Sequence, residues 1–141
     1  MSKNNVIKTA HPVNLIILNE LGQVLLVKRS SQDDFSGYWS IPGGGPIIDE
    51  NYEKALSREI TEELNCKIVQ MQYFQSYYYR AYPHLHVRAT YFFGTISGNI
   101  KLNDEATEYW WFDMVELPKL KLAYNQRQVL LDFVKFYKND K

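Results

Sequence analysis

The stretch that most constrains this chain is residues 43–66, GGGPIIDENYEKALSREITEELNC, where three glycines run into a segment rich in acids. Between Asp49 and Glu63 it holds six acidic and two basic residues, a local charge of −4 in a chain whose formal net charge is zero. Like charges one helical turn apart repel by about 0.2–0.5 kcal/mol per pair unless a cation neutralises them. The stretch therefore predicts a short acidic segment that is suited to bind a cation.

This segment has the periodicity of an amphipathic helix. We expect the helix to begin at Asn51, a favoured N-cap residue, and to end near Leu64. Apolar residues recur at every fourth position and form one stripe that can pack on a sheet: Tyr52, Leu56, Ile60 and Leu64. Three carboxylates at i, i+3 and i+4 project together beside that stripe: Glu59, Glu62 and Glu63. The acids are thus expected at the rim of a cleft.

The three carboxylates suit a hard, oxygen-seeking divalent cation. Mg²⁺ in proteins typically takes one or two carboxylates, several waters and the phosphate oxygens of a substrate, and Mn²⁺ is a common substitute. Acid-rich helices are also common as plain solvated surfaces. The E-x-x-E-E pattern alone therefore leaves both interpretations open.

The longer pattern around these acids resembles the Nudix box: glycine, five residues, glutamate, seven residues, Arg-Glu-apolar, one residue, Glu-Glu, one residue, glycine-apolar. Residues 44–66 match at seven of the nine specified positions: Gly44, Glu50, Arg58, Glu59, Ile60, Glu62 and Glu63. Asn65 stands in place of the second glycine and Cys66 in place of the final aliphatic residue. Asn tolerates the left-handed conformation past a helix end, and Cys often packs as a small hydrophobe. Both departures lie at the C-terminal end of the helix and leave the acidic residues unchanged.

The resemblance implies the Nudix fold, an α+β architecture in which a mixed β-sheet is sandwiched between helices (α/β/α), here in a single domain over residues 1–141. It implies metal ligation by the Gly43 carbonyl with Glu59, Glu62 and Glu63, one of which also acts as catalytic base. Gly44 is expected to let the backbone approach the substrate. Arg58 is expected to orient the carboxylates and is within reach of Glu50.

The implied reaction is Mg²⁺-dependent hydrolysis of a nucleoside diphosphate linked to another group X. An NTP or dNTP, oxidised ones included, would give NMP and pyrophosphate; ADP-ribose and nucleotide sugars are the alternative substrates. A non-catalytic, nucleotide-sensing module of the same fold is a further alternative, and loss of a helix glutamate would be its sign. All three glutamates are present. Many relatives are dimers, so a homodimer stays open.

Two charged residues outside the box are further candidates. Arg29 ends an apolar run and is expected to bind substrate phosphate with its planar guanidinium, although a plain surface base is the alternative. Glu105 and Glu108 lie in an acidic segment, and either can be an extra metal ligand or general base, or a solvated loop acid. Of the two, Glu105 is favoured.

Aromatic residues supply the candidates for nucleobase binding. Tyr79 belongs to a cluster with Tyr77, Tyr78 and Tyr82, which either fills half-buried strand positions or stacks on a base. Trp110 and Trp111 would face opposite sides of a strand, so that one lies in the core and the other walls the pocket. We expect Tyr79 and Trp110 to contact substrate.

The remaining chain reads as strands followed by a helix. The first ten residues are polar and are expected to be loosely held. Apolar runs predict a hairpin over residues 13–29 and two long antiparallel strands, 67–80 and 86–97, joined by a connection at 81–86. A final packing helix is expected within residues 123–141.

Composition limits the partners and the compartment. A chain of 141 residues suits one domain. Zero net charge argues against a general nucleic-acid or anionic-membrane binder, so any phosphate binding must be local. The partner that the resemblance implies is a small nucleotide. The single cysteine cannot form an intramolecular disulfide, and the N-terminus has no apolar signal segment. These features predict a cytoplasmic protein.

Overall fold

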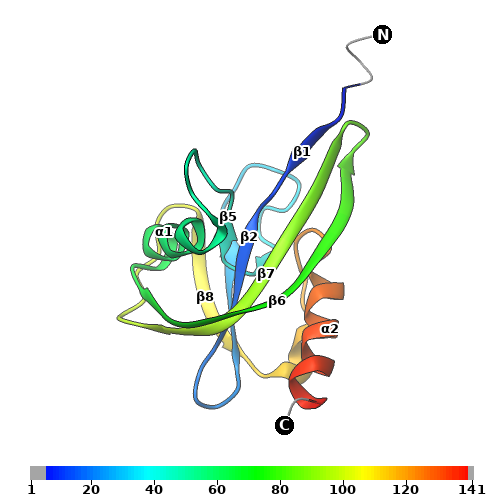
Figure 1. The fold of residues 1–141 in the computed structure, drawn as a ribbon. Helices are drawn as coiled ribbons and strands as arrows, with labels where there is room; N and C mark the ends of the chain where they lie inside the picture. Colours follow the sequence, from blue (N-terminus) through cyan, green and yellow to red (C-terminus); the bar gives the residue numbers. More distant parts are fainter. Residues whose placement is uncertain (1–5, 140–141) are drawn as a thin grey trace.

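The computed structural model describes residues 6–139, which build one mixed β-sheet with helices on both faces (Figure 1). The strands are β1 (Lys8–Ala10), β2 (Val13–Leu18), β3 (Val24–Arg29), β4 (Trp39–Ser40), β5 (Gly43–Gly44), β6 (Lys67–Tyr82), β7 (Leu85–Ser97) and β8 (Ala106–Phe112). The helices are α1 (Tyr52–Leu64), the 3₁₀ helix η2 (Met114–Lys119) and α2 (Gln126–Asn139). The predicted α+β arrangement of a sheet between helices is confirmed.

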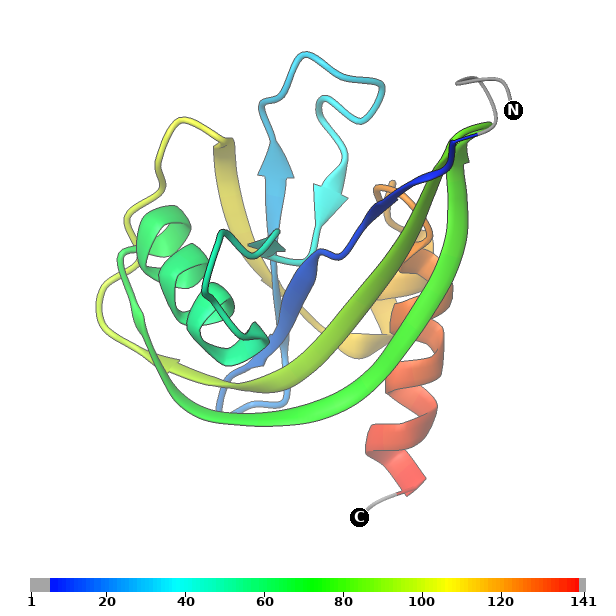
Figure 2. The ribbon, with the colours of Figure 1, turned by 45° about the horizontal axis from the view of Figure 1, so that its top comes forward.

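The sheet is mixed because β7 has partners of both directions. It runs antiparallel to β6 along its length, and parallel to β1 and β2 on its other edge. β6 and β7 together curl from α1 to a tip where β1 lies alongside them (Figure 2). No described helix is both long enough and apolar enough to cross a membrane.

Strands β2 and β3 form the predicted hairpin but pair only next to its turn, at Ile17–Leu25 and Leu18–Val24. Farther along they separate, because β2 takes β5 as its partner whereas β3 takes β4 and β8. The glycine loop thereby enters the sheet through the two residues of β5. This fork brings the glycine loop and α1 to the same end of the sheet.

Alternation along β2 and β3 creates two apolar cores, one under each helix. The core under α1 takes Val13, Leu15, Ile17, Leu25 and Val27 from the strands, and the core under α2 takes Ile16, Leu18, Val24 and Leu26. The predicted stripe of α1 faces the first core, where Leu56, Ile60 and Leu64 are fully buried. The packing of that stripe fixes the angle at which the acids of α1 leave the helix.

Both ends of α1 match the sequence. The Asn51 side chain accepts a hydrogen bond from the Lys54 amide, as an N-cap does. Asn65 closes the helix in the left-handed conformation, with φ 59° and ψ 34°, and Cys66 is buried beyond it. The two residues that depart from the box pattern therefore fill the conformational and packing roles of the residues they replace.

Two expectations about the strands are corrected. Residues 8–10 are not loosely held, because they pair with Leu85–Val87 of β7; residues 1–5 lie outside the described part of the chain. β6 continues to Tyr82, so that the connection to β7 is only Pro83 and His84. A pairing partner distant in sequence orders β1, and local composition cannot reveal it.

Candidate active site

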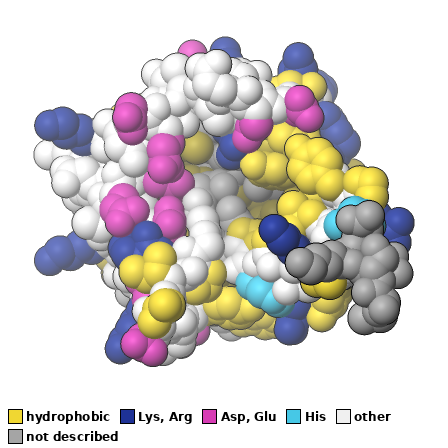
Figure 3. Space-filling view, turned by 90° about the horizontal axis from the view of Figure 1, so that it is seen from above, with side chains coloured by type: hydrophobic (Ala, Val, Ile, Leu, Met, Phe, Trp, Pro, Cys, Tyr) yellow, Lys and Arg dark blue, Asp and Glu magenta, His cyan; other side chains and the backbone are white. Residues whose placement is uncertain are grey.

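A pocket of about 480 Å³ lies between the glycine loop, the tip of the β6–β7 hairpin and the start of α2. From above it is a hollow with acidic side chains on the side of α1 and hydrophobic ones on the opposite side (Figure 3). Residues from the predicted site that line it are Arg29, Gly43, Gly44, Glu63 and Tyr79. The fold thus brings together residues that lie up to 50 positions apart.

Three carboxylates influence one another at the acidic end of the pocket. Burial, followed by the charges of Glu59 and Glu105, raises the pKa of Glu63 to about 9. Burial also raises the pKa of Glu59, although Arg58 lowers it in part. Glu63 and Glu105 come from different elements, contact each other and line a small cleft beside the pocket. The favoured one of the two loop acids is therefore the one placed at the site, whereas Glu108 pairs with Lys28 on the surface.

Arg58 is the hub of the remaining acids. Its Nε and Nη2 donate to the two carboxylate oxygens of Glu50 at 2.8 and 3.0 Å, and Nη1 donates to Glu59 at 3.0 Å. Nη1 also donates to Glu62 at 3.2 Å, and Nη2 to the carbonyl of Gly45 at 3.0 Å. The predicted contact with Glu50 is present. Arg58 ties helix α1 to the loop before it, which suits the orienting role predicted for it.

Glu62 lies farther out than its two neighbours. Its side chain is 54% exposed, and its charge acts on Glu59 and on Arg58. The group closest to the glycine loop is instead Glu63, whose Oε2 accepts a hydrogen bond of 3.1 Å from the Gly43 amide. Glu59 lies over the next glycine, because a Cβ on Gly44 would fall 2.5 Å from the Glu59 carboxyl carbon.

The donor set fits a hard divalent cation in chemistry. Within residues 6–139 no three His, Cys, Asp or Glu side chains are arranged so that they could hold a metal ion as they stand. The half-buried Glu63 nevertheless has one amide donor and two like charges around it, which is unfavourable for a carboxylate without a counter-charge. A divalent cation supplies that counter-charge, and the available donors are carboxylate and carbonyl oxygens, which Mg²⁺ prefers.

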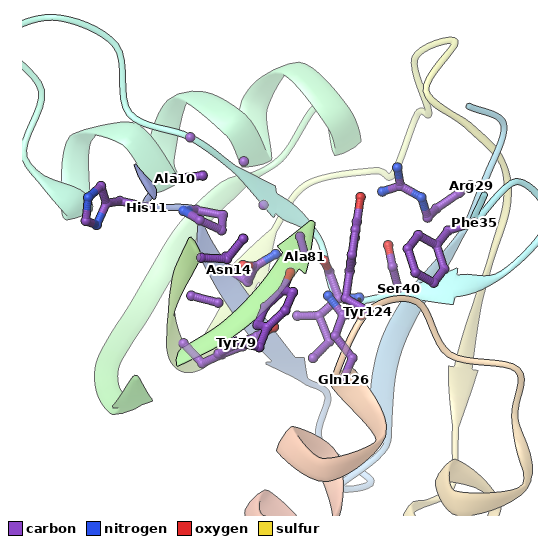
Figure 4. Close-up of a pocket in the computed structure, with 18 of the residues that line it drawn as sticks. Ala10, His11, Asn14, Arg29, Phe35, Ser40, Tyr79, Ala81, Tyr124 and Gln126 are labelled. Carbon is purple, nitrogen blue, oxygen red and sulfur yellow. Dashed lines mark hydrogen bonds between the residues drawn. The ribbon is translucent and has the colours of Figure 1, made fainter. Parts of the chain in front are cut away.

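Arg29 lines the pocket beside Phe35 (Figure 4). Its Nη2 donates to Asp33 at 2.8 Å, and its guanidinium lies over the Tyr124 ring at 5.1 Å. Its Nε is buried with no partner among the described residues. Arg29 also lines the small cleft that contains Glu63 and Glu105, so its positive charge lies close to the acids.

The tyrosine cluster does not form one platform. Tyr79 points into the pocket, as predicted, and Tyr82 lines it as well (Figure 4 labels Tyr79). Tyr77 donates instead to Asp132 of α2 at 2.7 Å, and Tyr78 lies on the other sheet face beneath Arg88. Tyr77 therefore fills a half-buried strand position, whereas stacking of Tyr79 on a base stays a prediction.

Trp110 is not placed at the pocket, contrary to the prediction. Trp110 lies on the edge strand β8, where it pairs with Leu26 of β3. The residue is 62% exposed and does not line the pocket. Trp111 packs against the core under α1. Strand alternation correctly separates the two tryptophans, but the pocket lies at the other end of the fork from this part of β8.

The sequence analysis missed the back wall of the pocket. The rings of Phe35 and Tyr124 pack at a tilt of 50° with their centroids 4.5 Å apart, and Asn14 and Gln126 lie buried at the base. Asn125 follows Tyr124, lines an adjoining pocket and carries a buried side-chain oxygen with no partner among the described residues. Phe35 and Tyr124 come from two loops, Asn14 from β2 and Gln126 from the start of α2, so no local sequence pattern groups them.

Comparison with known proteins agrees with this geometry. The family model described as NUDIX domain matches residues 8–133. An ADP-ribose pyrophosphatase of Methanocaldococcus jannaschii is 31% identical over 131 residues, covering 89% of this chain and 75% of that protein. A putative 8-oxo-dGTP diphosphatase of Bacillus subtilis is 32% identical over 123 residues, covering 82% and 74%.

Solved structures show the same fold. A MutT protein from Methanosarcina mazei superposes with a TM-score of 0.83 at 26% identity, covering 96% of this chain and 98% of that chain. The Escherichia coli ORF135 protein superposes with a TM-score of 0.82 at 25% identity, covering 93% and 92%. The resemblance seen in residues 44–66 thus extends over the whole architecture, and the chain belongs to the NUDIX domain family, whose hydrolases act on phosphorus-containing anhydrides.

Proposed function

We propose that the protein is a Mg²⁺-dependent pyrophosphohydrolase that converts a nucleoside triphosphate to a nucleoside monophosphate and pyrophosphate, oxidised dNTPs included. The observation that carries this proposal is a single pocket with acids at one end and aromatic rings at the other. A substrate that fills both ends needs a phosphate chain joined to a flat apolar group. A nucleotide has both parts.

The metal would be held at the acidic end. Glu59, Glu62 and Glu63 with the Gly43 carbonyl are the proposed ligands, and Glu105 is the proposed additional ligand or base. A bound Mg²⁺ would neutralise phosphate charge and acidify a coordinated water. A cytoplasmic location and a small-molecule partner remain part of the proposal, supported by the single cysteine, which is buried, and by a pocket of about 480 Å³.

The chain's own residues position the reacting groups. Arg58 holds Glu59 and Glu50 in fixed orientations through charge-assisted hydrogen bonds. The glycine loop offers its backbone without side chains in the way. Arg29 lines the pocket and is placed to donate from its guanidinium to the phosphate chain between the two ends of the pocket. Its ion pair with Asp33 keeps the guanidinium oriented.

The aromatic end is proposed to bind the base. Phe35, Tyr79 and Tyr124 line it, and stacking of a base on an aromatic ring contributes about 1–3 kcal/mol. Asn125, which follows Tyr124, lines a second pocket that shares Phe35, Tyr79 and Tyr124 with this one.

ADP-ribose is the second candidate substrate. Its support is the relative named as an ADP-ribose pyrophosphatase, which this chain resembles over 89% of its length. The relative named as a putative 8-oxo-dGTP diphosphatase supports the triphosphate instead. Both substrates present a purine nucleoside and a diphosphate to the same pocket.

The test is a turnover screen with Mg²⁺ and with Mn²⁺. Pyrophosphate release from NTPs, dNTPs and 8-oxo-dGTP is compared with formation of AMP from ADP-ribose and of the matching nucleoside monophosphate from nucleotide sugars, for the native chain and for Glu62→Gln. Turnover of one class that the substitution reduces at least tenfold supports the proposal and chooses the substrate. Nucleotide binding without turnover by the native chain would replace it with a sensor module.

A pair of aromatic substitutions tests where the base binds. Tyr124→Ala removes a ring of the pocket wall, so KM should rise about tenfold or more with a smaller change in kcat. Trp110→Ala removes a more exposed ring outside the pocket, and KM should stay within about twofold. Steady-state kinetics on the substrate found in the screen gives both values, and the reverse ranking would move the base to the β8 edge.

A further inference from the structure

The peptide of Ile41 is held from both sides by buried side chains. The Ile41 amide donates to Gln126 Oε1 at 2.9 Å, and the Ile41 carbonyl accepts from Asn14 Nδ2 at 3.1 Å. Gln126 is 3% exposed and Asn14 is 8% exposed. We call Asn14, Ile41 and Gln126 the Ile41 clamp. It joins β2 and α2 to the strand that leads into the glycine loop.

The clamp is the end of a longer seam between residues 121–126 and residues 39–41. The Trp39 amide donates to the Lys121 carbonyl at 2.8 Å, and the Ala123 amide donates to the Trp39 carbonyl at 2.9 Å. The Gln126 side chain continues this sequence of contacts to Ile41 and also hydrogen-bonds the buried Tyr91. The segment that presents Tyr124 and Asn125 to the pocket is thereby attached to the base of the glycine loop.

The glycine loop contacts the acids of α1 at Gly43, two residues after Ile41. The Pro42 carbonyl accepts from the Leu15 amide at 2.9 Å, and the Gly43 amide donates to Glu63 at 3.1 Å. Gly43 pairs with Asn14 of β2 and lies so close to it that an added Cβ would fall 2.1 Å from the Val13 carbonyl oxygen. The Ile41 clamp and the pairing with β2 therefore hold Gly43 together, next to Glu63.

We propose that Gln126 is a positioning residue that, with Asn14, fixes the Gly43 carbonyl against Glu63 for metal binding. The inference rests on the proposed metal-dependent hydrolysis and deepens it, because it names a residue of α2 that acts on the metal site without touching it. Groups that orient metal ligands from outside typically change metal affinity or activity by about 10–100-fold when removed. Gln126 would act on the metal site in this indirect way, through the Ile41 peptide and Gly43.

Gln126→Met tests the clamp with little change in side-chain shape. Mn²⁺ affinity, measured from the free-ion EPR signal of the full-length variant, should fall about tenfold or more, and kcat should fall with it. KM for the nucleotide should change by less than about threefold, because Tyr124 stays in place. Gln128→Met is the matched control, since Gln128 is an exposed residue of the same helix whose side chain donates to Asp132; it should leave both quantities unchanged.

Asn14→Leu provides a second, independent arm from β2. It removes the other hydrogen bond of the clamp and should weaken Mn²⁺ binding in the same direction. If both variants melt at lower temperatures but keep native Mn²⁺ affinity, the proposal is overturned, because the clamp then serves folding alone. If neither variant folds, the proposal is overturned too. Native Mn²⁺ binding without turnover would refute the hydrolase and leave the affinity test of the clamp intact, whereas a native chain that binds no Mn²⁺ would refute both.

Discussion

The Glu63→Gln variant should melt at a higher temperature than the native chain in the absence of metal, although it should retain less than about a hundredth of the activity. The carboxyl of Glu63 ordinarily titrates near 4.5, but in the folded protein its pKa is about 9. At pH 7 the folded state keeps a proton that the unfolded state releases. Because one pKa unit corresponds to 1.36 kcal/mol and pH 7 lies about 2.5 units above the ordinary pKa, this lowers the free energy of unfolding by about 3 kcal/mol.

The upward shift of the Glu63 pKa sets the pH range in which the melting temperatures should differ. A raised acid pKa costs nothing below about pH 4.5, where both states are protonated, and the cost grows until about pH 9. Glutamine cannot ionise, so the gain of the variant should increase over this window and reach about 5–10 °C at pH 7 in chelator. Glu20→Gln, an exposed acid of the β2–β3 turn, is the control and should change neither quantity. An equal or lower melting temperature for Glu63→Gln at pH 7 would contradict the raised pKa of Glu63.

Gly43→Ala should be the most damaging single-methyl change in the glycine loop. Gly43 has φ +154°, and a Cβ would fall 2.1 Å from the Val13 oxygen and 2.6 Å from Asn14 Cα, both of which are backbone atoms. Because neither neighbour can rotate away, β5 must leave β2, and we expect a loss of about 3 kcal/mol or more of stability together with the activity.

The two neighbouring glycines separate stability from activity. At Gly44 the added Cβ meets only the Glu59 carboxylate, which is the end of a flexible side chain. Gly44→Ala should therefore displace Glu59 and reduce kcat about tenfold or more while costing less than about 1 kcal/mol of stability. At Gly45 nothing lies within 4 Å, so Gly45→Ala should change stability by less than about 1 kcal/mol. Chemical unfolding and turnover of the three variants check this order, and equal stability losses at all three positions would contradict it.

Much of the acidic half of the site can be predicted from the sequence. The boundaries of α1, its apolar stripe and the spacing of its glutamates depend on residues within a few turns of one another, where local rules are strong. Asn65 is an example: its left-handed conformation follows from its place just beyond Leu64. The contact between Arg58 and Glu50 is also local, since the two residues are eight positions apart.

The aromatic half could not be predicted in the same way. Tyr124 and Gln126 reach the pocket through contacts with residues 39–41, more than 80 positions earlier, and no periodic pattern encodes that pairing. The pairing of β1 with β7 is equally distant. The alternation of side chains along a strand separates Trp110 from Trp111 but does not say which of the two meets the pocket. The separation of β2 from β3 determines where the pocket lies, and Trp110 is not part of it.

The separation of acids and aromatic rings across the hollow has a kinetic consequence. A bare polyphosphate that diffuses toward the pocket meets the carboxylates of α1, which carry charge of its own sign, so the field of this end opposes its approach. A nucleotide whose phosphates are partly neutralised by a bound divalent cation meets weaker repulsion. The charge asymmetry of a chain that is neutral as a whole thus favours entry of the metal–nucleotide complex over the bare polyphosphate.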